Sequence, residues 1–267
     1  MNITLAYHAI VAISRRELLK FWHQKGRLLS ALVRPMLWLI VFAAGFQNIF
    51  GVSIIPPYDS YIEYQEYVVP GLLGMVVLFN GMQSSLAMVY DREVGLMKLL
   101  LTAPLPRWFL LLAKLLAGTL LSLIQAYAFL ALCWAFQVNI PLSGWVTALP
   151  ALFLSGLMLG ALGLLLSVYV KQLENFAGTM NFVIFPMFFM STALYPLWKL
   201  QESGAEVVHQ LATFNPFTHA VELIRFSLYG QFNGVAALTV LGTFCLFFLL
   251  AVYGYKPQRG LLKKTKR

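Results

Sequence analysis

The sequence predicts an all-α, polytopic integral membrane protein. It has six transmembrane helices, an N-terminal interfacial amphipathic helix and an outer re-entrant or interfacial helical segment before the last span. Three observations predict this class. The chain is 60% apolar and only 11% charged, whereas a soluble domain carries about 25% charged residues. Its apolar residues gather in runs close to the ~20 residues that a helix needs to cross a bilayer. Its basic residues lie in the loops and tails between and after these runs, where they orient a membrane protein.

Residues 1–30 are too polar to span a membrane. One helical face carries four basic side chains at spacings of four, three and four: Arg16, Lys20, His23 and Arg27. Four apolar side chains lie on the other side: Leu18, Phe21, Trp22 and Leu29. The pattern predicts a basic helix in the membrane interface, with its cations toward lipid headgroups and with Arg16, Lys20, Phe21 and Trp22 as its defining residues. The alternative is a plain cytosolic tail.

A six-helix membrane domain is predicted over residues 31–255, followed by a basic cytoplasmic tail over residues 256–267. The spans are expected at about 31–50, 68–89, 110–136, 145–169, 176–197 and 235–255. Gly156 and Gly160 form a GxxxG motif in the fourth span, which favours close packing within the chain rather than a dimer contact. Polar side chains inside the spans either bond to neighbouring helices, which we favour, or line a pathway: Asn80, Gln83, Gln125 and Asn181. Lys114 and Glu174 are expected to be solvated charges near span ends.

Loop charges predict the topology. Five Lys or Arg residues precede the first span, and none lies between the first and second spans, where Asp59, Glu63 and Glu66 occur. The next loop is basic again, and six Lys or Arg residues lie in the tail. By the positive-inside rule both termini are cytoplasmic, which agrees with an even number of spans.

The long segment 198–234 is predicted on the outer side. After Asn215-Pro216, four apolar residues fall on one helical stripe: Phe217, Val221, Ile224 and Leu228. Glu222 and Arg225 lie three apart on another face. The pattern favours an interfacial or re-entrant helix, which is tolerated at membrane depth only where protein or water covers its backbone. The alternative is an ordinary solvated loop.

The segment from Tyr90 to Lys114 is charged although apolar runs flank it. It opens with Asp91-Arg92-Glu93 and breaks at Pro104 and Pro106. A charge at the centre of the hydrocarbon costs roughly 2.5–3.5 kcal/mol even on a lenient insertion scale. The segment is therefore predicted to be a structured loop at a membrane face, where a partner protein acts on the membrane domain.

The sequence lacks the motifs of an enzyme. There is no HExxH, no CxxC, no GxSxG and no GxxxxGK[ST] phosphate loop, so we expect no catalytic residue, no metal site and no ATPase site in this chain. The net charge of +9 is carried by loops and tails, which favours contact with anionic lipid and not with nucleic acid.

The segment YDREVGLMKLLLTAPLPRWFLLLAKLL resembles the signature of the type-2 (ABC-2 type) permease subunits of ATP-binding cassette exporters. Arg92-Glu93, Gly95, the leucine run, Pro104 and Lys114 match, whereas Lys98 stands where glutamate is common. The N-terminal interfacial helix with Glu17 and Leu18, which precedes Arg34-Pro35, looks like that family's connector helix. NPFTHAVELIR is similar to the family's outer Asn-Pro segment, with His219 in place of a tyrosine. The run from Tyr61 to Arg107 looks closest to permeases linked to quinoprotein alcohol-oxidation clusters.

The resemblance implies a permease subunit of an exporter in a bacterial inner membrane. Its partners would be two copies of a cytoplasmic ATPase subunit, which hold ATP-Mg, and a second permease subunit, with a homodimer as the expectation. The residues implied to couple to the ATPase are Arg92, Glu93, Gly95, Lys98 and Pro104. Two alternatives stay open: an ATP-independent channel or carrier, and a membrane anchor for a periplasmic enzyme complex.

Overall fold

The computed structural model of the chain describes residues 3–23, 25–46, 56–58, 60–94, 105–170 and 172–255, and its regular elements in these ranges are helices. The helices are α1 (Ile3–His23), α2 (Lys25–Phe46), α3 (Tyr64–Glu93), α5 (Arg107–Ala135), α6 (Leu142–Tyr169), α7 (Leu173–Phe189), α8 (Leu197–Glu202), α9 (Glu206–Phe214), α10 (Pro216–Leu228) and α11 (Gly234–Gly254). The all-α prediction is confirmed.

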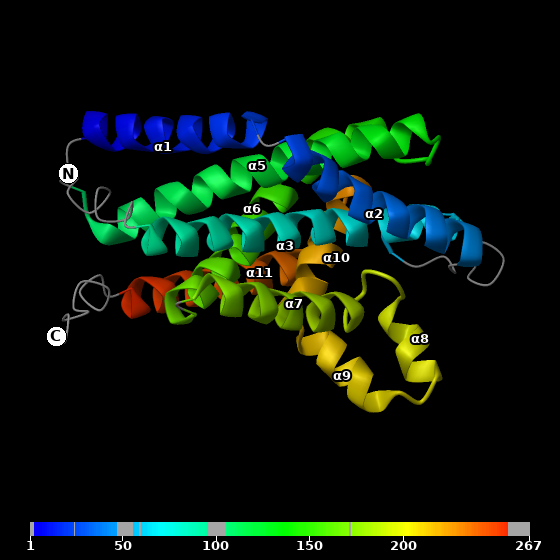
Figure 1. Cartoon of the computed structure of the whole chain (residues 1–267). Helices are drawn as coiled ribbons and strands as arrows, with labels where there is room; N and C mark the ends of the chain where they lie inside the picture. The colour runs from blue at the N-terminus through cyan, green and yellow to red at the C-terminus, as the bar shows by residue number, and fades with distance from the viewer. Residues whose placement is uncertain are drawn as a thin grey trace.

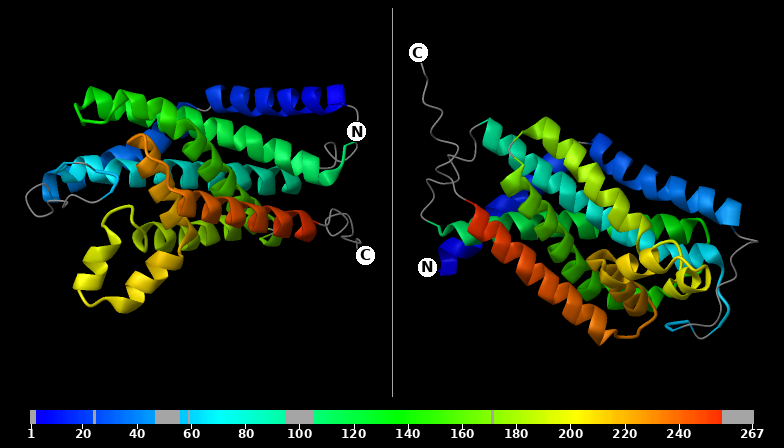
Figure 2. Two further views of the ribbon diagram at one scale, coloured as in Figure 1. Left: turned by 180° about the vertical axis from the view of Figure 1, so that it is seen from behind. Right: turned by 90° about the horizontal axis from the view of Figure 1, so that it is seen from below.

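Figure 1 shows α3, α5, α7 and α11 running lengthwise through one bundle, whereas α8 and α9 project from its side. The view from below in Figure 2 shows α1 crossing the direction of these helices. The start of α1 and the ends of α3 and α11 lie at the same end of the bundle, which we call the Asp91 end. The opposite end, where α10 lies, is called the α10 end.

Helix α3 forms the centre of the bundle. It packs against α2, α5, α6, α7 and α10, and every residue from Tyr67 to Met82 is buried. A helix that is hydrophobic all round is one that neighbours cover on all sides, and α3 fits that rule. Any displacement of α3 therefore reaches most of the membrane domain.

Small residues bring α3, α5 and α6 into close contact. A Cβ atom at Gly81 of α3 would lie 3.1 Å from the Cα atom of Gly160 in α6, and one at Gly156 would lie 2.8 Å from a side-chain atom of Thr119 in α5. The amide of Asn80 donates to the carbonyl of Gly118 in α5 at 3.0 Å. The GxxxG motif therefore packs within the chain, as predicted, and Asn80 bonds to a neighbouring helix.

Four of the helices are long and apolar enough to cross a membrane: α3, α5, α6 and α11. They correspond to the predicted spans at 68–89, 110–136, 145–169 and 235–255. The fifth predicted span is the 17-residue helix α7. The first falls on α2, whose apolar part covers Ala31–Val41, and its last residues, 47–50, lie outside the described ranges. The full count of six spans stays a prediction, and the tail 256–267 is outside the described part of the chain.

The predicted end of the fifth span, at residue 197, is wrong. Helix α7 ends at Phe189. The carbonyls at this end accept hydrogen bonds from side chains in place of the N–H groups of a further helical turn. The amide of Asn215 donates to the carbonyls of Met187 and Met190, at 2.7 and 2.6 Å, and the hydroxyl of Ser191 donates to the carbonyl of Phe188 at 2.6 Å.

The predicted helix after Asn215-Pro216 is confirmed as α10. The side chain of Asn215 accepts from the N–H of Phe217 at 3.0 Å, and Pro216 occupies the first helical position, which is the usual chemistry of a helix start. The four residues of the predicted apolar stripe are all buried. Helix α10 packs on α3, α6 and α11, so protein covers its backbone.

Candidate functional site: the last turn of α3

Asp91 gathers three cations at the end of α3. Its side chain is 3% exposed, and its carboxylate lies 2.9 Å from the ammonium of Lys114 in α5. The guanidinium of Arg16 and the ammonium of Lys20, both in α1, lie 3.6 and 3.7 Å from the same carboxylate. A nearly buried carboxylate needs such partners, because an unpaired charge removed from water is costly. Asp91 thereby ties α1 and α5 to α3.

The next residue, Arg92, holds the end of α6. Its guanidinium donates to the carbonyl of Ser167 at 2.9 Å and to the carbonyl of Val170 at 2.8 Å. Both carbonyls lie where α6 ends, so they lack a following turn of helix to bond to. A cation at the carboxyl end of a helix also opposes the negative end of the helix dipole.

Glu93 holds the start of α7. Its carboxylate accepts from the backbone N–H of Leu173 at 3.0 Å, and Leu173 is the first residue of α7. This N–H has no partner inside its own helix, and a carboxylate at the amino end of a helix is favoured by the dipole. The neighbouring Glu174 is exposed, as predicted for a solvated charge.

Three consecutive side chains therefore connect the end of α3 to four other helices: α1, α5, α6 and α7. The chain leaves α3 immediately after them and re-enters the described structure just before α5, which begins at Arg107. Of the predicted coupling residues, the structure places Arg92 and Glu93 in this connection. Gly95, Lys98 and Pro104 lie outside the described residues. A force applied to the segment after Glu93 would be passed on by these contacts.

Two residues of this site were missed or misjudged from the sequence. Asp91 was counted among the loop charges, and Lys114 was expected to be solvated, whereas the Lys114 side chain is only 14% exposed and pairs with Asp91. The prediction for Lys114 is wrong because α3 and α5 bring their charged ends together, which lowers the exposure of both. The signal available was one acid and one base at the two ends of a single loop.

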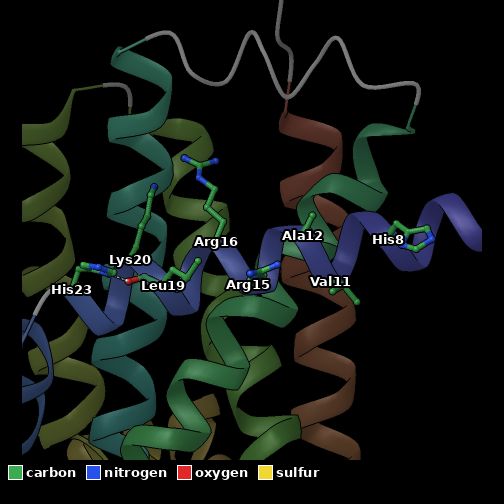
Figure 3. A pocket seen from close by; sticks show the side chains of 8 residues that line it. All are labelled: His8, Val11, Ala12, Arg15, Arg16, Leu19, Lys20 and His23. Atoms are coloured by element: carbon green, nitrogen blue, oxygen red, sulfur yellow. Dashed lines mark hydrogen bonds between the residues drawn. The ribbon is translucent and has the colours of Figure 1, made fainter.

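The predicted residues of α1 have divided roles. Phe21 is 5% exposed and Trp22 is 78% exposed, so Phe21 packs against the protein and Trp22 points away from it. Figure 3 shows Arg16 and Lys20 projecting to the same side of α1, and both lie close to Asp91. The sequence pattern does not predict these contacts with a nearly buried carboxylate, and the orientation of the two cations toward lipid headgroups stays a prediction.

A groove runs along α1 next to this site. Figure 3 shows the residues that line it: His8, Val11, Ala12, Arg15, Arg16, Leu19, Lys20 and His23. The ring of His23 contacts the carbonyl of Leu19 at 2.8 Å, so it is turned back on its own helix. Within the described residues, no group of three or more His, Cys, Asp or Glu side chains could hold a metal ion.

The other predicted residues lie at the α10 end and form a separate cluster. Arg225 is 4% exposed at its side chain and pairs with Glu222, which is 21% exposed. The guanidinium also donates to the carbonyl of Thr192 at 2.7 Å and lies 4.2 Å from the ring centroid of Tyr67. Asn215 caps α10 and the end of α7, as described above. The structure therefore does not bring this group into contact with the last turn of α3.

Aromatic side chains enclose the Arg225 pair. The ring of Tyr58 meets that of Tyr229 edge to face, with centroids 4.8 Å apart. Burial raises the pKa of the Tyr58 phenol to about 12, so this group is neutral at physiological pH. Arg225 therefore has a carboxylate, a carbonyl and neutral rings around it, an arrangement suited to holding α10 in place.

Comparisons with known proteins agree on one family. The family model described as ABC-2 type transporter matches residues 8–229. A protein of Porphyra purpurea named as a transport permease, ycf38, is 29% identical over 81% of this chain and 72% of its own length. The daunorubicin resistance ABC transporter permease protein DrrB1 of Streptomyces coeruleorubidus is 25% identical over 80% and 73%. The inner membrane transport permease YadH of Escherichia coli (strain K12) is 23% identical over 92% and 91%.

Proposed function

Because the chain belongs to the ABC-2 type transporter family and is a membrane permease subunit of an ABC transporter, we propose that the last turn of α3 is where its ATPase drives it. The segment between residues 90 and 107 receives the ATPase on the side of the membrane where ATP is present. Asp91, Arg92 and Glu93 then pass the movement to the rest of the bundle. The single observation that carries this proposal is that these three consecutive residues contact four different helices.

The contacts suit the transmission of force better than a flexible loop would. A Gly-Ser linker behaves as a random coil and absorbs displacement, whereas Arg92 and Glu93 fix the junction between α6 and α7 from both sides. The guanidinium holds the carbonyls that end α6, and the carboxylate holds the N–H that starts α7. Moving the end of α3 would therefore move both sides of this junction together.

The proposed assembly has two such permease subunits, most simply a homodimer, and two ATPase subunits that hold ATP-Mg. We place the Asp91 end at the cytoplasmic face of a bacterial inner membrane. Two observations support this orientation: the basic loop and tails belong to this end in the sequence pattern, and α1 begins and α11 ends here. The names of DrrB1, a daunorubicin resistance permease, and YadH, an inner membrane transport permease, support transport across an inner membrane.

The first experiment isolates the tagged permease from its host in mild detergent and identifies what accompanies it by mass spectrometry. We expect a soluble ATPase with a GxxxxGK[ST] loop, in an amount equal to the permease. A monodisperse permease that never carries an ATPase would overturn the coupling proposal.

The second experiment tests the coupling residues in the isolated complex. Hydrogen exchange at the start of α7 is measured with and without a non-hydrolysable ATP analogue. In the unmodified complex we expect an ATP-dependent change at residues 173–176, and Glu93→Gln should abolish it while the ATPase stays bound. Glu174→Gln is the matched control, because it removes an exposed carboxylate one residue into the same helix. An unchanged response in Glu93→Gln would contradict the role of Glu93.

A further inference from the structure

An arginine lies beside the middle of the bundle, far from the site at the end of α3, and its side chain is partly buried. The guanidinium carbon of Arg34, in α2, is 3.7 Å from the ring centroid of Phe79 in α3. Phe79 is the sixteenth of the 30 residues of α3, so it stands at the middle of a helix that is long enough to cross a bilayer. The sequence places Arg34 near the start of a span, where it would reach the interface. The structure places it beside the middle of α3.

Arg34 lacks a carboxylate partner among the residues that the structure describes. The ion pairs in those ranges involve Asp91 or Glu222, whereas the guanidinium of Arg34 faces the apolar ring of Phe79. Charged side chains at membrane depth are expensive and usually have a functional partner. A cation of this kind is a candidate binding group for an anion.

A second side chain at the same place also lacks a partner. Gln125, in α5, is 0% exposed, and within the described structure neither its amide nitrogen nor its amide oxygen has a hydrogen-bond partner. A buried amide is normally hydrogen-bonded, because an unpaired one has given up its bonds to water without replacing them. The depression that Gln125 lines is bordered by Arg34 and Pro35 of α2 and by Phe79, Asn80 and Gln83 of α3.

We propose that this depression binds the phosphate group of an anionic lipid or of another phosphate-bearing amphiphile. The guanidinium of Arg34 presents paired donors that match a phosphate, and the amide of Gln125 adds a neutral donor from the interior. The depression has room for about one water-sized group, so it takes oxygen atoms of the headgroup, and the rest of the molecule stays outside. This proposal does not depend on the coupling function of the last turn of α3.

The surroundings of Arg34 favour an amphiphile over a soluble anion. Leu37 and Val41 follow Arg34 on the same face of α2 at spacings of three and four, and they are 56% and 60% exposed. On α7, the ring of Phe185 meets Phe79 edge to face at 6.5 Å and is itself 42% exposed. An alkyl chain that leaves the headgroup would therefore lie along exposed apolar side chains, whereas inorganic phosphate would gain nothing from them.

The test uses the full-length permease in detergent, without an ATPase, and counts bound molecules by native mass spectrometry. Phosphatidic acid, phosphatidylcholine and inorganic phosphate are titrated separately. We expect one phosphatidic acid molecule per chain to bind at least tenfold more tightly than phosphatidylcholine, and inorganic phosphate to bind weakly. Arg34→Gln should lower the affinity for phosphatidic acid about tenfold. Arg15→Gln, which removes the same charge from the exposed face of α1, should change it less than twofold.

Gln125→Leu provides a second variant that keeps the charge of Arg34. It should weaken phosphatidic acid binding several-fold while raising the melting temperature of the lipid-free protein, because it removes an unpaired buried amide. Equal losses for Arg34→Gln and Arg15→Gln would show general charge attraction and overturn the site. If inorganic phosphate bound as tightly as phosphatidic acid, the claim that the ligand is an amphiphile would be overturned. An unchanged affinity in both Arg34→Gln and Gln125→Leu would overturn the proposal as a whole. Each of these results leaves the coupling experiments unaffected.

Discussion

The two ends of the bundle hold their helices together in different ways. At the Asp91 end two of the three cations are partly exposed: Arg16 and Lys20 are 37% and 39% exposed at their side chains. At the α10 end the cation is enclosed, with Arg225 only 4% exposed. Contacts of the first kind are weakened by water and salt, whereas contacts of the second kind are weakened much less. The comparison indicates that the α10 end is a fixed support and that the Asp91 end can be rearranged.

The largest effect is expected from Arg225→Met. It leaves Glu222 and the carbonyl of Thr192 without the guanidinium that bonds to both of them. Breaking a buried pair costs about 3–5 kcal/mol, and the partial exposure of Glu222 makes this an upper value here. Unfolding in mixed detergent micelles, followed by circular dichroism, should show this loss. The double variant Arg225→Met with Glu222→Met should recover most of it, since neither charge is then left alone. A single variant as stable as the unmodified protein would show that the α10 end is not the support.

Asp91→Asn should have a smaller effect on stability and a local one on structure. Hydrogen bonds to charged groups contribute about 1.5–3 kcal/mol, and the amide keeps part of the contact with Lys114. We expect faster hydrogen exchange in α1, which loses its pairing with Asp91, and no change in α10. Glu174→Gln serves as the control for removal of an exposed carboxylate. Faster exchange throughout the bundle would contradict the view that the two ends are held independently.

Gly71→Ala tests the packing of the α10 end without changing any charge. A Cβ atom at this position would overlap the carbonyl oxygen of Ala193, so the segment after α7 must shift, at a cost of about 1–3 kcal/mol. At Gly178 in α7, a Cβ atom would meet nothing within 4 Å. Gly178→Ala should therefore stabilise α7 slightly, by up to about 1 kcal/mol. The difference between the two melting temperatures is the measurement, and equal values would refute the close approach.

The smallest effect is expected from salt. Raising the ionic strength from 0.1 to 1 M shortens the screening length from about 10 to about 3 Å, which is less than the distances from Arg16 and Lys20 to Asp91. Exchange in α1 should rise by a few-fold, whereas exchange in α10 should stay the same. A response of equal size in both helices would remove the distinction between the two ends.

The sequence was sufficient for elements whose apolar pattern is long and regular. The spans that became α3, α5, α6 and α11 were located to within a few residues, and the buried stripe of α10 was read correctly from Phe217 and the residues that follow it. These predictions succeed because a bilayer imposes length and apolarity on each helix separately.

The rest depended on contacts between distant residues. The end of α7 is fixed by Asn215, which lies 25 residues beyond Met190 and donates a hydrogen bond to its carbonyl. No local sequence pattern predicts that bond. The site was half predicted: Arg92 and Glu93 were named, but their partners lie at least 75 residues away. The pairing of Lys114 with Asp91 spans only 23 residues, but it too depends on how α3 and α5 pack together.

The order Asp91-Arg92-Glu93 has a mechanical consequence. Successive residues of an α-helix point about 100° apart around its axis, so these three side chains reach out in three directions spread around the circumference of α3. Contacts on one side alone would let the helix rotate about its long axis. Contacts on all sides block rolling about the long axis and leave tilting and sliding as the available motions. A force on the end of α3 therefore displaces the neighbouring helices and does not rotate α3 about its own axis.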